Sequence, residues 1–419
     1  MISIDDALDS VLAAVRPLGG EEVPLLGALG RAAADTIVSP EQVPSFENSA
    51  MDGFAVSGAE LAAGRREFEL RFDIPAGSWV NEAIGAGEAA RIMTGAPVPA
   101  GADTVVPVEK TAFREGAVFI AEPVEPGANV RHAGEDVAAG DVLFARGARF
   151  GPAEVGLLAA VGYQTVKVAC RPRVAILATG SELVAPGIPL EPGQIRNSNS
   201  VTAYGQTLAA GGEPVLLGIA RDDVDETRRL LRQALEHDVV ITSGGVSVGD
   251  YDFVKQVQED LGVERRFWGV TTKPGKPLAF GVLGDTLVFG VPGNPVAAMV
   301  SFELYVRPAI LALQGRPDRY RPYVIAAASE PVRRSKDRTE VRRCRLLHRG
   351  DGWAFTVTGP QGSGILSSMA GAEGLVFVPP EFPAADAGAK LMVTLLSGSS
   401  VERPPYPGGA GTAPSTPRG

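Results

Sequence analysis

The stretch VVITSGGVSVGD, residues 239–250, places a short apolar run directly before a loop rich in glycine and hydroxyl groups. Similar apolar runs recur between residues 171 and 316, and segments of helical length separate them. This alternation predicts an α/β doubly wound domain, with a mainly parallel sheet between two layers of helices. The other runs lie at 174–178, 215–219 and 288–291, and the predicted helices at 200–210, 224–236, 253–261 and 296–313.

All four runs end in loops of polar, glycine or proline residues. The carboxyl ends of parallel strands share one edge of a sheet, and ligands bind outside that edge. The loop that follows residue 242 suits an anion, because its glycines let backbone N–H groups approach a ligand closely. The simpler interpretation is a turn in which Asp252 caps the next helix. The candidate anion-binding residues are Ser243, Gly244, Gly245 and Ser247.

A second loop, KPGKP at 273–277, carries two lysines on a backbone that two prolines and a glycine constrain. It is either a solvated turn or a preorganised clamp for a phosphate or another oxyanion. We favour the clamp, with Lys273 and Lys276 as cations, because the chain is acidic overall, with a formal net charge of −10. The acidic balance also argues against a nucleic-acid partner, which needs a basic face.

Three carboxylates follow three different strands of the predicted sheet, namely Glu182, Asp222 and Asp252. Carboxylates beside an anionic ligand repel it, so we expect a bridging Mg²⁺, which prefers carboxylates, water and phosphates. Helix capping is the competing explanation for at least one of the three.

Other kinds of site find little support. The two cysteines and three histidines do not cluster, which argues against a disulfide framework or a zinc site. No apolar run reaches the roughly 18 residues of a membrane span, and the N-terminus lacks the pattern of a signal peptide. We therefore expect a cytoplasmic protein without a membrane partner.

The regions outside the α/β segment differ from it in pattern. Residues 44–130 have short apolar runs between glycines and prolines and predict a β-rich insert, and residues 322–398 predict a small β-barrel in the same way. Apolar residues at helical spacing over 3–16, with Ser3 as N-cap, predict an N-terminal helix. The composition of 402–419 predicts a disordered tail.

Six short strings occur in the order NSAMDGFAV (48–56), MTGAPVP (93–99), GED (134–136), GGVSVG (244–249), KPGKP (273–277) and PGNP (292–295). Together they resemble the molybdopterin molybdenumtransferases of the MoeA family, and the chain is similar to the E domain of gephyrin. The resemblance extends from residue 3 to about 398. It implies an elongated homodimer, in which each active site lies between the α/β domain of one subunit and the N-terminal domains of the other.

The resemblance also implies four domains and a reaction. Molybdenum from molybdate is inserted at the dithiolene of adenylylated molybdopterin, the adenylate is hydrolysed with Mg²⁺ or another divalent ion, and AMP leaves. Further implied partners are the molybdopterin adenylyltransferase and apo-molybdoenzymes. The domains are a split N-terminal helical domain at 1–43 and 131–170, a β-rich insert at 44–130, an α/β molybdopterin-binding domain at 171–316 and a C-terminal β-barrel at 321–398.

Residue roles follow from the matching strings. Lys273 and Lys276 are implied to hold molybdate or the phosphate of the substrate, and the loop 243–249 to cradle the pterin or phosphate end. Glu182, Asp222 and Asp252 are implied to position the metal or polarise water. The partner subunit is implied to contribute Asp52, Thr94, Arg131 and Asp136. Pro292 and Pro295 are implied to shape the pocket wall, and Arg343 and Ser367 are further oxyanion candidates.

Two alternatives stay open. One is a related enzyme, such as a molybdopterin adenylyltransferase or a nucleotide-processing hydrolase, and the other is a molybdopterin-binding scaffold or chaperone without catalysis. The chain departs from the family pattern at Ser181, where many relatives carry Asp, and at Gly269, where many carry a basic residue after the Trp. Arg265 or Arg266 is the candidate replacement for that cation.

Overall fold

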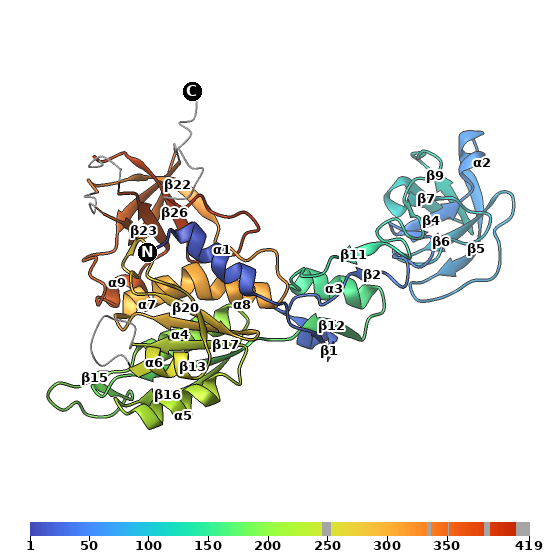
Figure 1. Cartoon of the computed structure of the whole chain (residues 1–419). Coiled ribbons are helices and arrows are strands. Elements are labelled where there is room, and N and C mark those ends of the chain that lie inside the picture. Colours follow the sequence, from blue (N-terminus) through green and yellow to red (C-terminus); the bar gives the residue numbers. More distant parts are fainter. Residues whose placement is uncertain (245–252, 333–336, 351, 381–385, 408–419) are drawn as a thin grey trace.

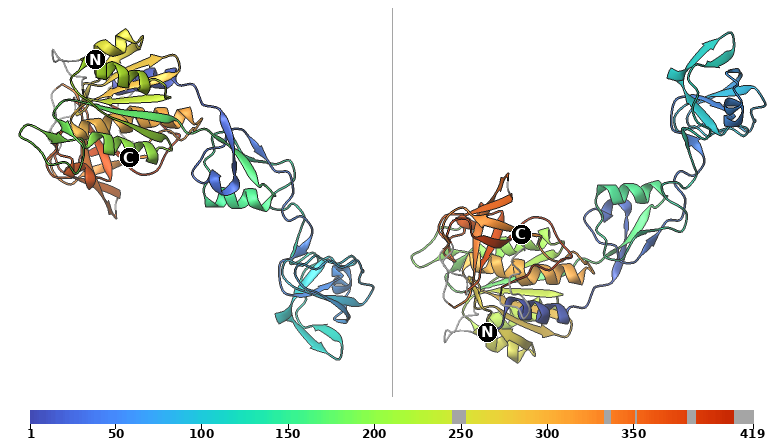
Figure 2. Two further views of the ribbon diagram at one scale, coloured as in Figure 1. Left: turned by 90° about the horizontal axis from the view of Figure 1, so that it is seen from below. Right: turned by 90° about the horizontal axis from the view of Figure 1, so that it is seen from above.

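The computed structural model describes residues 1–244, 253–332, 337–350, 352–380 and 386–407. Three lobes lie in a row (Figure 1). The α/β domain and the barrel form a large lobe at one end, the β-rich insert forms the other end, and a small middle lobe joins them. Figure 2 shows the same separation from two further directions. The chain is therefore elongated.

The sheet of the large lobe has the strand order β16-β13-β17-β21-β20-β18. Its first four strands are parallel, and the last two complete it in antiparallel fashion. This topology confirms the predicted α/β domain. The strands are β13 (Arg173–Thr179), β16 (Glu213–Ala220), β17 (Val239–Ser243), β18 (Glu264–Trp268), β20 (Ala279–Leu283) and β21 (Thr286–Val291), with a small pair of β14 (Leu183–Val184) and β15 (Ile195–Arg196) outside the sheet.

Helices cover both faces of this sheet. Leu177 of β13 packs with α5 and α6 on one face, and Ile176 packs with the helices of the other face. Among the described residues, one helical run, 295–313, is long and apolar enough to cross a membrane, but 94% of its most apolar window is buried, as in a core helix. The helices are α4 (Asn199–Ala209), α5 (Val224–Ala234), α6 (Phe253–Asp260), α7 (Pro295–Ser301), the π-helical turn η3 (Phe302–Val306) and α8 (Arg307–Leu313).

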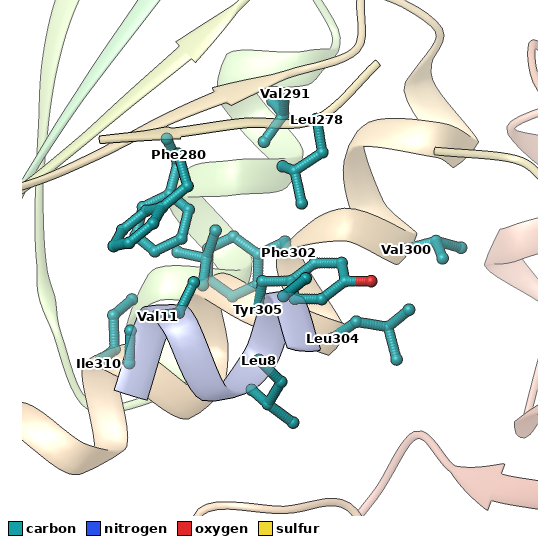
Figure 3. Close-up of a cluster of buried hydrophobic side chains, with 14 of the residues drawn as sticks. Leu8, Val11, Leu278, Phe280, Val291, Val300, Phe302, Leu304, Tyr305 and Ile310 are labelled. Carbon is teal, nitrogen blue, oxygen red and sulfur yellow. The ribbon is translucent and has the colours of Figure 1, made fainter. Parts of the chain in front are cut away.

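The N-terminal helix α1 (Ile4–Ala14) forms as predicted, and Ser3 caps it. Its position differs from our expectation, because we assigned residues 1–43 to the split N-terminal domain. Instead, α1 packs on the α/β domain, where Leu8 and Val11 belong to the same buried cluster as Tyr305 (Figure 3). The physical reason is that the apolar stripe of α1 finds an extensive buried surface on the run 295–313.

Five strands close the C-terminal barrel in the order β23-β24-β22-β26-β25, and β25 pairs back to β23. This confirms the predicted barrel. A short strand directly before the first proline of KPGKP, β19 (Thr272–Lys273), pairs with β23 in parallel and so attaches the lysine loop (residues 273–277) to the barrel. The elements are β22 (Tyr323–Ala328), β23 (Thr339–Arg349), β24 (Gly352–Val357), β25 (Gly374–Val378), β26 (Lys390–Leu395) and the helix α9 (Ser367–Ala370).

The tail that we predict as disordered is ordered at its start. In residues 402–407, Arg403 forms ion pairs with Asp5 and Asp9 of α1, and the Tyr406 ring is buried. Composition is a poor guide here, because one aromatic ring and one paired guanidinium suffice to dock a short segment. The prediction of disorder is therefore wrong for 402–407, and the rest of the tail lies outside the described residues.

The middle lobe is less helical than the predicted split helical domain. In residues 15–43 and 131–170, all of which the structure describes, one α-helix accompanies two antiparallel ribbons, β1–β12 and β2–β11. Val166 and Val168 alternate with exposed residues, which is the pattern of a strand with one buried face. The elements are β1 (Gly20–Pro24), the 3-10 turn η1 (Leu25–Ala28), β2 (Ile37–Val38), β11 (Val142–Phe144), α3 (Pro152–Ala160) and β12 (Thr165–Ala169).

The insert is β-rich, as predicted, with a sheet of order β7-β4-β6-β5-β9-β8. Apolar clusters lie on both faces of this sheet, so the insert has a core of its own. The elements are β3 (Asn48–Ser49), β4 (Gly53–Val56), α2 (Gly58–Ala62), β5 (Glu67–Ile74), β6 (Glu88–Ile92), β7 (Thr104–Pro107), the turn η2 (Val108–Lys110), β8 (Thr111–Arg114), β9 (Ala117–Ile120) and β10 (Val130–Arg131).

Candidate active site

The carboxyl ends of the four parallel strands meet at one edge of the sheet. The register places Ser243 of β17 between Ala178 and Val291 of its neighbours. Gly244 follows with a φ of +93°, and a Cβ there would lie 2.6 Å from the Thr179 carbonyl oxygen, so glycine alone permits this approach. The loops therefore converge as predicted. The candidates Gly245, Ser247 and Asp252 lie outside the described residues.

A cavity of about 620 Å³ opens at this edge. Asn199, at the start of α4, donates from Nδ2 to the Ser243 hydroxyl oxygen at 2.7 Å and to the Gly293 carbonyl oxygen at 2.8 Å. These bonds tie the loops after β17 and β21 together. Because amide and hydroxyl groups make up most of its polar lining, we call it the amide cavity. Its polar lining includes Glu182, Arg196, Asn197, Asn199, Ser243 and Asn294, and its wall also includes Pro295.

A second cavity of about 600 Å³ adjoins the first and shares Pro277, Pro292 and Asn294 with it. Both domains of the large lobe contribute cations to it, and we call it the cationic cavity. The predicted lysines of the lysine loop lie in its wall beside two arginines of the barrel. Its charged lining among the described residues is Lys273, Lys276, Arg338, Arg342 and Glu340.

Backbone contacts fix the lysine loop. The Val270 N–H donates to the Lys276 carbonyl oxygen at 3.0 Å, and the pairing of β19 with β23 holds the other end. Gly275 is buried with a φ of +104°, a conformation that side-chain-bearing residues rarely adopt. Lys273 Nζ lies 3.4 Å from Glu340 Oε1, whereas Lys276 has no ion-pair partner within the described part of the chain. The loop thus presents one paired and one available ammonium group.

Arg338 and Arg342 are absent from our predicted site. The sequence held a signal for them, because the segment RRSKDRTEVRRCR at 333–345 is strongly basic in an acidic chain. Such a concentration of positive charge favours an anionic ligand. In the structure, Arg342 Nη2 lies 2.5 Å from Glu340 Oε2.

Arg343 and Ser367, which we predict as further oxyanion ligands, line neither cavity. Successive residues of a strand face opposite sides, so Arg343 turns away from the cavity that Arg342 lines. Its buried guanidinium donates to the Ser368 hydroxyl and to carbonyl oxygens of 360–362, and burial lowers its pKa. Arg343 therefore braces a loop beside the cationic cavity, and Ser367 lines a separate depression of the barrel.

The predicted metal ligands are only partly brought together. Glu182 lines the amide cavity, whereas the Asp222 carboxylate accepts from the Ser181 N–H at 3.2 Å and the Ser181 hydroxyl accepts from the Asp222 N–H at 3.1 Å. Ser181, the first departure from the family pattern, thus joins two loops. Among the described residues, no three His, Cys, Asp or Glu side chains form a metal cage. The Glu182 carboxylate in the amide cavity fits Mg²⁺ that is held by one or two carboxylates together with phosphates of a substrate.

The second departure, Gly269, has a φ of +84°. Arg265 pairs with Glu259 and Arg266 pairs with Glu264, and neither lines the cationic cavity. The structure therefore does not bring either arginine to the lysine loop as a replacement cation. The arginines of the barrel supply positive charge there instead.

The remaining predicted site residues lie outside the large lobe. Asp52 Oδ1 accepts from the Thr94 N–H at 2.7 Å and from the Thr94 hydroxyl at 2.8 Å, and these bonds lower the pKa of the carboxyl group. Arg131 belongs to β10, which pairs with β3 at the base of the insert, and Asp136 lies in an exposed turn nearby. Asp52 and Thr94 flank strands of the insert, whereas both cavities belong to the large lobe. Within one chain the middle lobe lies between the insert and the large lobe (Figure 2).

Family models cover nearly the whole chain. The MoeA N-terminal region (domain I and II) matches residues 2–162, a probable molybdopterin binding domain matches 175–312, and the MoeA C-terminal region (domain IV) matches 326–396. The three matches fall on all three lobes of the structure.

Individual relatives agree with these models. Molybdopterin molybdenumtransferase 2 of Mycobacterium tuberculosis is 39% identical over 397 residues, which cover 91% of this chain and 96% of that protein. The molybdopterin molybdenumtransferase of Bacillus subtilis is 35% identical over 404 residues, 94% of each chain. The crystal structure of the molybdopterin biosynthesis moea protein from Pyrococcus horikosii matches with a TM-score of 0.82 at 34% identity, over 95% of this chain and 100% of that one. On its fold, its ordered motifs and these full-length matches, the chain belongs to the MoeA family of molybdopterin molybdenumtransferases.

Proposed function

We propose that this chain is a transferase of molybdenum cofactor biosynthesis, which inserts molybdenum from molybdate into adenylylated molybdopterin and releases AMP. The observation that carries this proposal is the pair of adjoining cavities, one lined by amide and hydroxyl groups and the other by four cations. Molybdate is a tetrahedral dianion and needs fixed donors and cations, which the cationic cavity offers. The full-length similarity to proteins named for this activity supports the same assignment.

The proposed mechanism relies on positioning and electrostatics. Lys276 and Lys273 hold the oxyanion, and the pterin with its phosphates occupies the amide cavity, where Asn199 fixes the hydroxyl of Ser243. Pro292 and Asn294 belong to the wall that both cavities share. A pterin substrate bound in the amide cavity therefore has its dithiolene next to the molybdate in the cationic cavity. Holding two reactants side by side removes much of the entropic barrier to their reaction.

Hydrolysis of the adenylate needs charge stabilisation at the phosphoanhydride. Glu182 is the described carboxylate placed to hold Mg²⁺ in the amide cavity, with the phosphates of the substrate as further ligands. Bound Mg²⁺ would neutralise charge that develops on the phosphate oxygens. Asp222 acts here by fixing the Ser181 loop next to Glu182.

The proposal includes a homodimer in the cytoplasm. The Asp52–Thr94 pair, Arg131 and Asp136 complete the site when a second subunit brings its insert to the cavities. The elongated shape supports this arrangement, because the insert of a single chain lies at the opposite end from its own cavities (Figure 1). The molybdopterin adenylyltransferase and apo-molybdoenzymes are the proposed upstream and downstream partners.

The test is AMP release from adenylylated molybdopterin by the purified chain, with molybdate and Mg²⁺ present. We expect Lys276→Ala to reduce the rate at least about a hundredfold, because it removes a cation from the oxyanion site. Lys390→Ala, which removes an exposed lysine of the barrel outside both cavities, is the matched control and leaves the rate unchanged. Binding of the pterin without any AMP release by the unaltered chain would instead identify a scaffold.

A further inference from the structure

Glu340 is the carboxylate that faces the cationic cavity, the only one among its described lining residues. Its side chain is 13% exposed, and its two oxygens contact two different cations. Oε1 lies 3.4 Å from Lys273 Nζ, and Oε2 lies 2.5 Å from Arg342 Nη2 and 3.2 Å from Arg342 Nε. The carboxylate of Glu340 therefore lies among the cations that we propose to bind a dianion.

The backbone fixes this arrangement from two domains. Lys273 of β19 and Glu340 of β23 are register partners in a parallel pair, so the ladder itself sets their separation. Glu340 and Arg342 are two residues apart on one strand and share a face of it. The carboxylate is thus held between a cation of the α/β domain and a cation of the barrel.

We propose that Glu340 is an internal counter-anion, a positioning residue that orders Lys273 and Arg342 and weakens the binding of the oxyanion. The inference deepens the proposed function and rests on it, because it concerns the same oxyanion site. Whereas the lysines attract the oxyanion, Glu340 opposes its binding, and Glu340 lies outside the six sequence motifs.

Two electrostatic effects follow from one carboxylate. Without it, Lys273 and Arg342 repel each other and Lys273 loses its ion pair with Glu340, so ordering in advance lowers the cost of binding. Once a dianion enters, the same carboxylate repels it over a few ångströms in a partly desolvated site. The oxyanion is consequently bound firmly enough to be placed but loosely enough to leave for the dithiolene. Tighter ground-state binding alone gives no gain in turnover.

The two possible roles of Glu340 give opposite signs in an experiment. If it only held the arginine and lysine in place, its neutralisation would weaken oxyanion binding. If it acts as a counter-anion, neutralisation strengthens binding. The decisive substitution is Glu340→Gln, which keeps the size of the side chain and one acceptor oxygen for Arg342 but removes the charge.

The experiment measures molybdate binding by calorimetry, with molybdate as the only ligand, at several concentrations of chloride. For Glu340→Gln we expect a Kd lower by roughly fivefold or more, and a steeper dependence of affinity on salt. In AMP release, the KM for molybdate falls as well, whereas kcat does not rise. Glu264→Gln, which neutralises an exposed partner of Arg266 outside the cavity, leaves the Kd unchanged.

Glu340→Asp keeps the charge but withdraws it by one methylene, and we expect an intermediate gain in affinity. This variant decides the question if Glu340→Gln does not fold. An unchanged or higher Kd in the variants, together with binding by the unaltered chain, would overturn the role of Glu340 alone. Absence of molybdate binding in the unaltered chain and in all variants would overturn this inference together with the oxyanion site of the proposed function.

Discussion

The cationic cavity and the Asp52–Thr94 pair are two polar features that lie in different lobes of the molecule, and they are built differently. The cavity joins two domains through the pairing of β19 with β23, and its charge is mainly positive. The pair is local to the insert, negative and exposed, and two hydrogen bonds from a single residue fix it. Each region holds what the other lacks, which is the arrangement expected of two halves of one site.

The strongest test of this comparison recombines the halves. We expect Asp52→Ala and Lys276→Ala to reduce AMP release at least about a hundredfold each, because each removes a group from a preorganised site. If the site lies between subunits, mixing the two variants restores about a quarter of the activity, since half of the dimers are mixed and each re-forms one complete site. The measurement is AMP release by the mixture after exchange of subunits.

Asp136→Ala mixed with Asp52→Ala is the control, because both changes fall on the same side of the proposed interface. This mixture stays inactive. Confirmed mixed dimers of Asp52→Ala and Lys276→Ala that remain inactive would show that the two regions do not form a shared site.

The sequence predicts some parts of the cationic cavity much better than others. Apolar periodicity predicts the α/β sheet, and the prolines and glycine of KPGKP predict the constrained lysine loop, because both signals are local in the sequence. The partnership of Lys273 with Glu340 is not local, because it depends on a register between two domains. The same limit explains why the sequence alone does not distinguish Arg342, which lines the cavity, from the neighbouring Arg343, which does not. Only the pleat of β23 determines which of the two faces the cavity.

The two arginines therefore offer a comparison within the cavity region. Arg343→Met leaves several buried acceptors without a donor, and we expect it to lower the free energy of unfolding by about 3 kcal/mol. Arg342→Met has a smaller effect on stability but weakens molybdate binding about tenfold, since it removes a charge-assisted donor from the cavity wall. Chemical denaturation and calorimetry separate the two effects. A loss of affinity without a loss of stability in Arg343→Met would contradict the assignment of Arg343 to the framework.

Residues 402–407 pack on the large lobe and form no part of the insert. Tyr406 packs against Phe377 with ring centroids 5.2 Å apart and is 4% exposed. We expect Tyr406→Ala to lower the stability of the large lobe by about 2 kcal/mol, because it removes a buried aromatic side chain from the core. Hydrogen exchange monitored by mass spectrometry is the measurement. Faster exchange in α1 with unchanged exchange in the insert is expected, and faster exchange throughout would mean that the lobes unfold as one unit.

The smallest predicted effect concerns Asp52 itself. Hydrogen bonds from the Thr94 N–H and hydroxyl hold the pKa of the carboxyl group below its ordinary value of 3.8. Because the folded pKa is the lower one, the contribution to stability is present above the unfolded value of about 3.9 and is lost as the pH falls through the folded value. The group is exposed, so solvent screening keeps this contribution small.

The measurement is an NMR titration of the Thr94 amide proton, with Asp52→Asn as the control. We expect a midpoint below the ordinary value in the unaltered chain and no titration step at that amide in the variant. If the cationic cavity of a partner faces Asp52, assembly brings positive charge nearby and lowers the midpoint further. A dilution series that dissociates the dimer then raises the midpoint toward that of an isolated insert. A midpoint at or above 3.8 at every concentration would show that Thr94 does not hold a charged carboxylate in place. That result would contradict the proposal that the insert contributes Asp52 to the active site of a partner subunit.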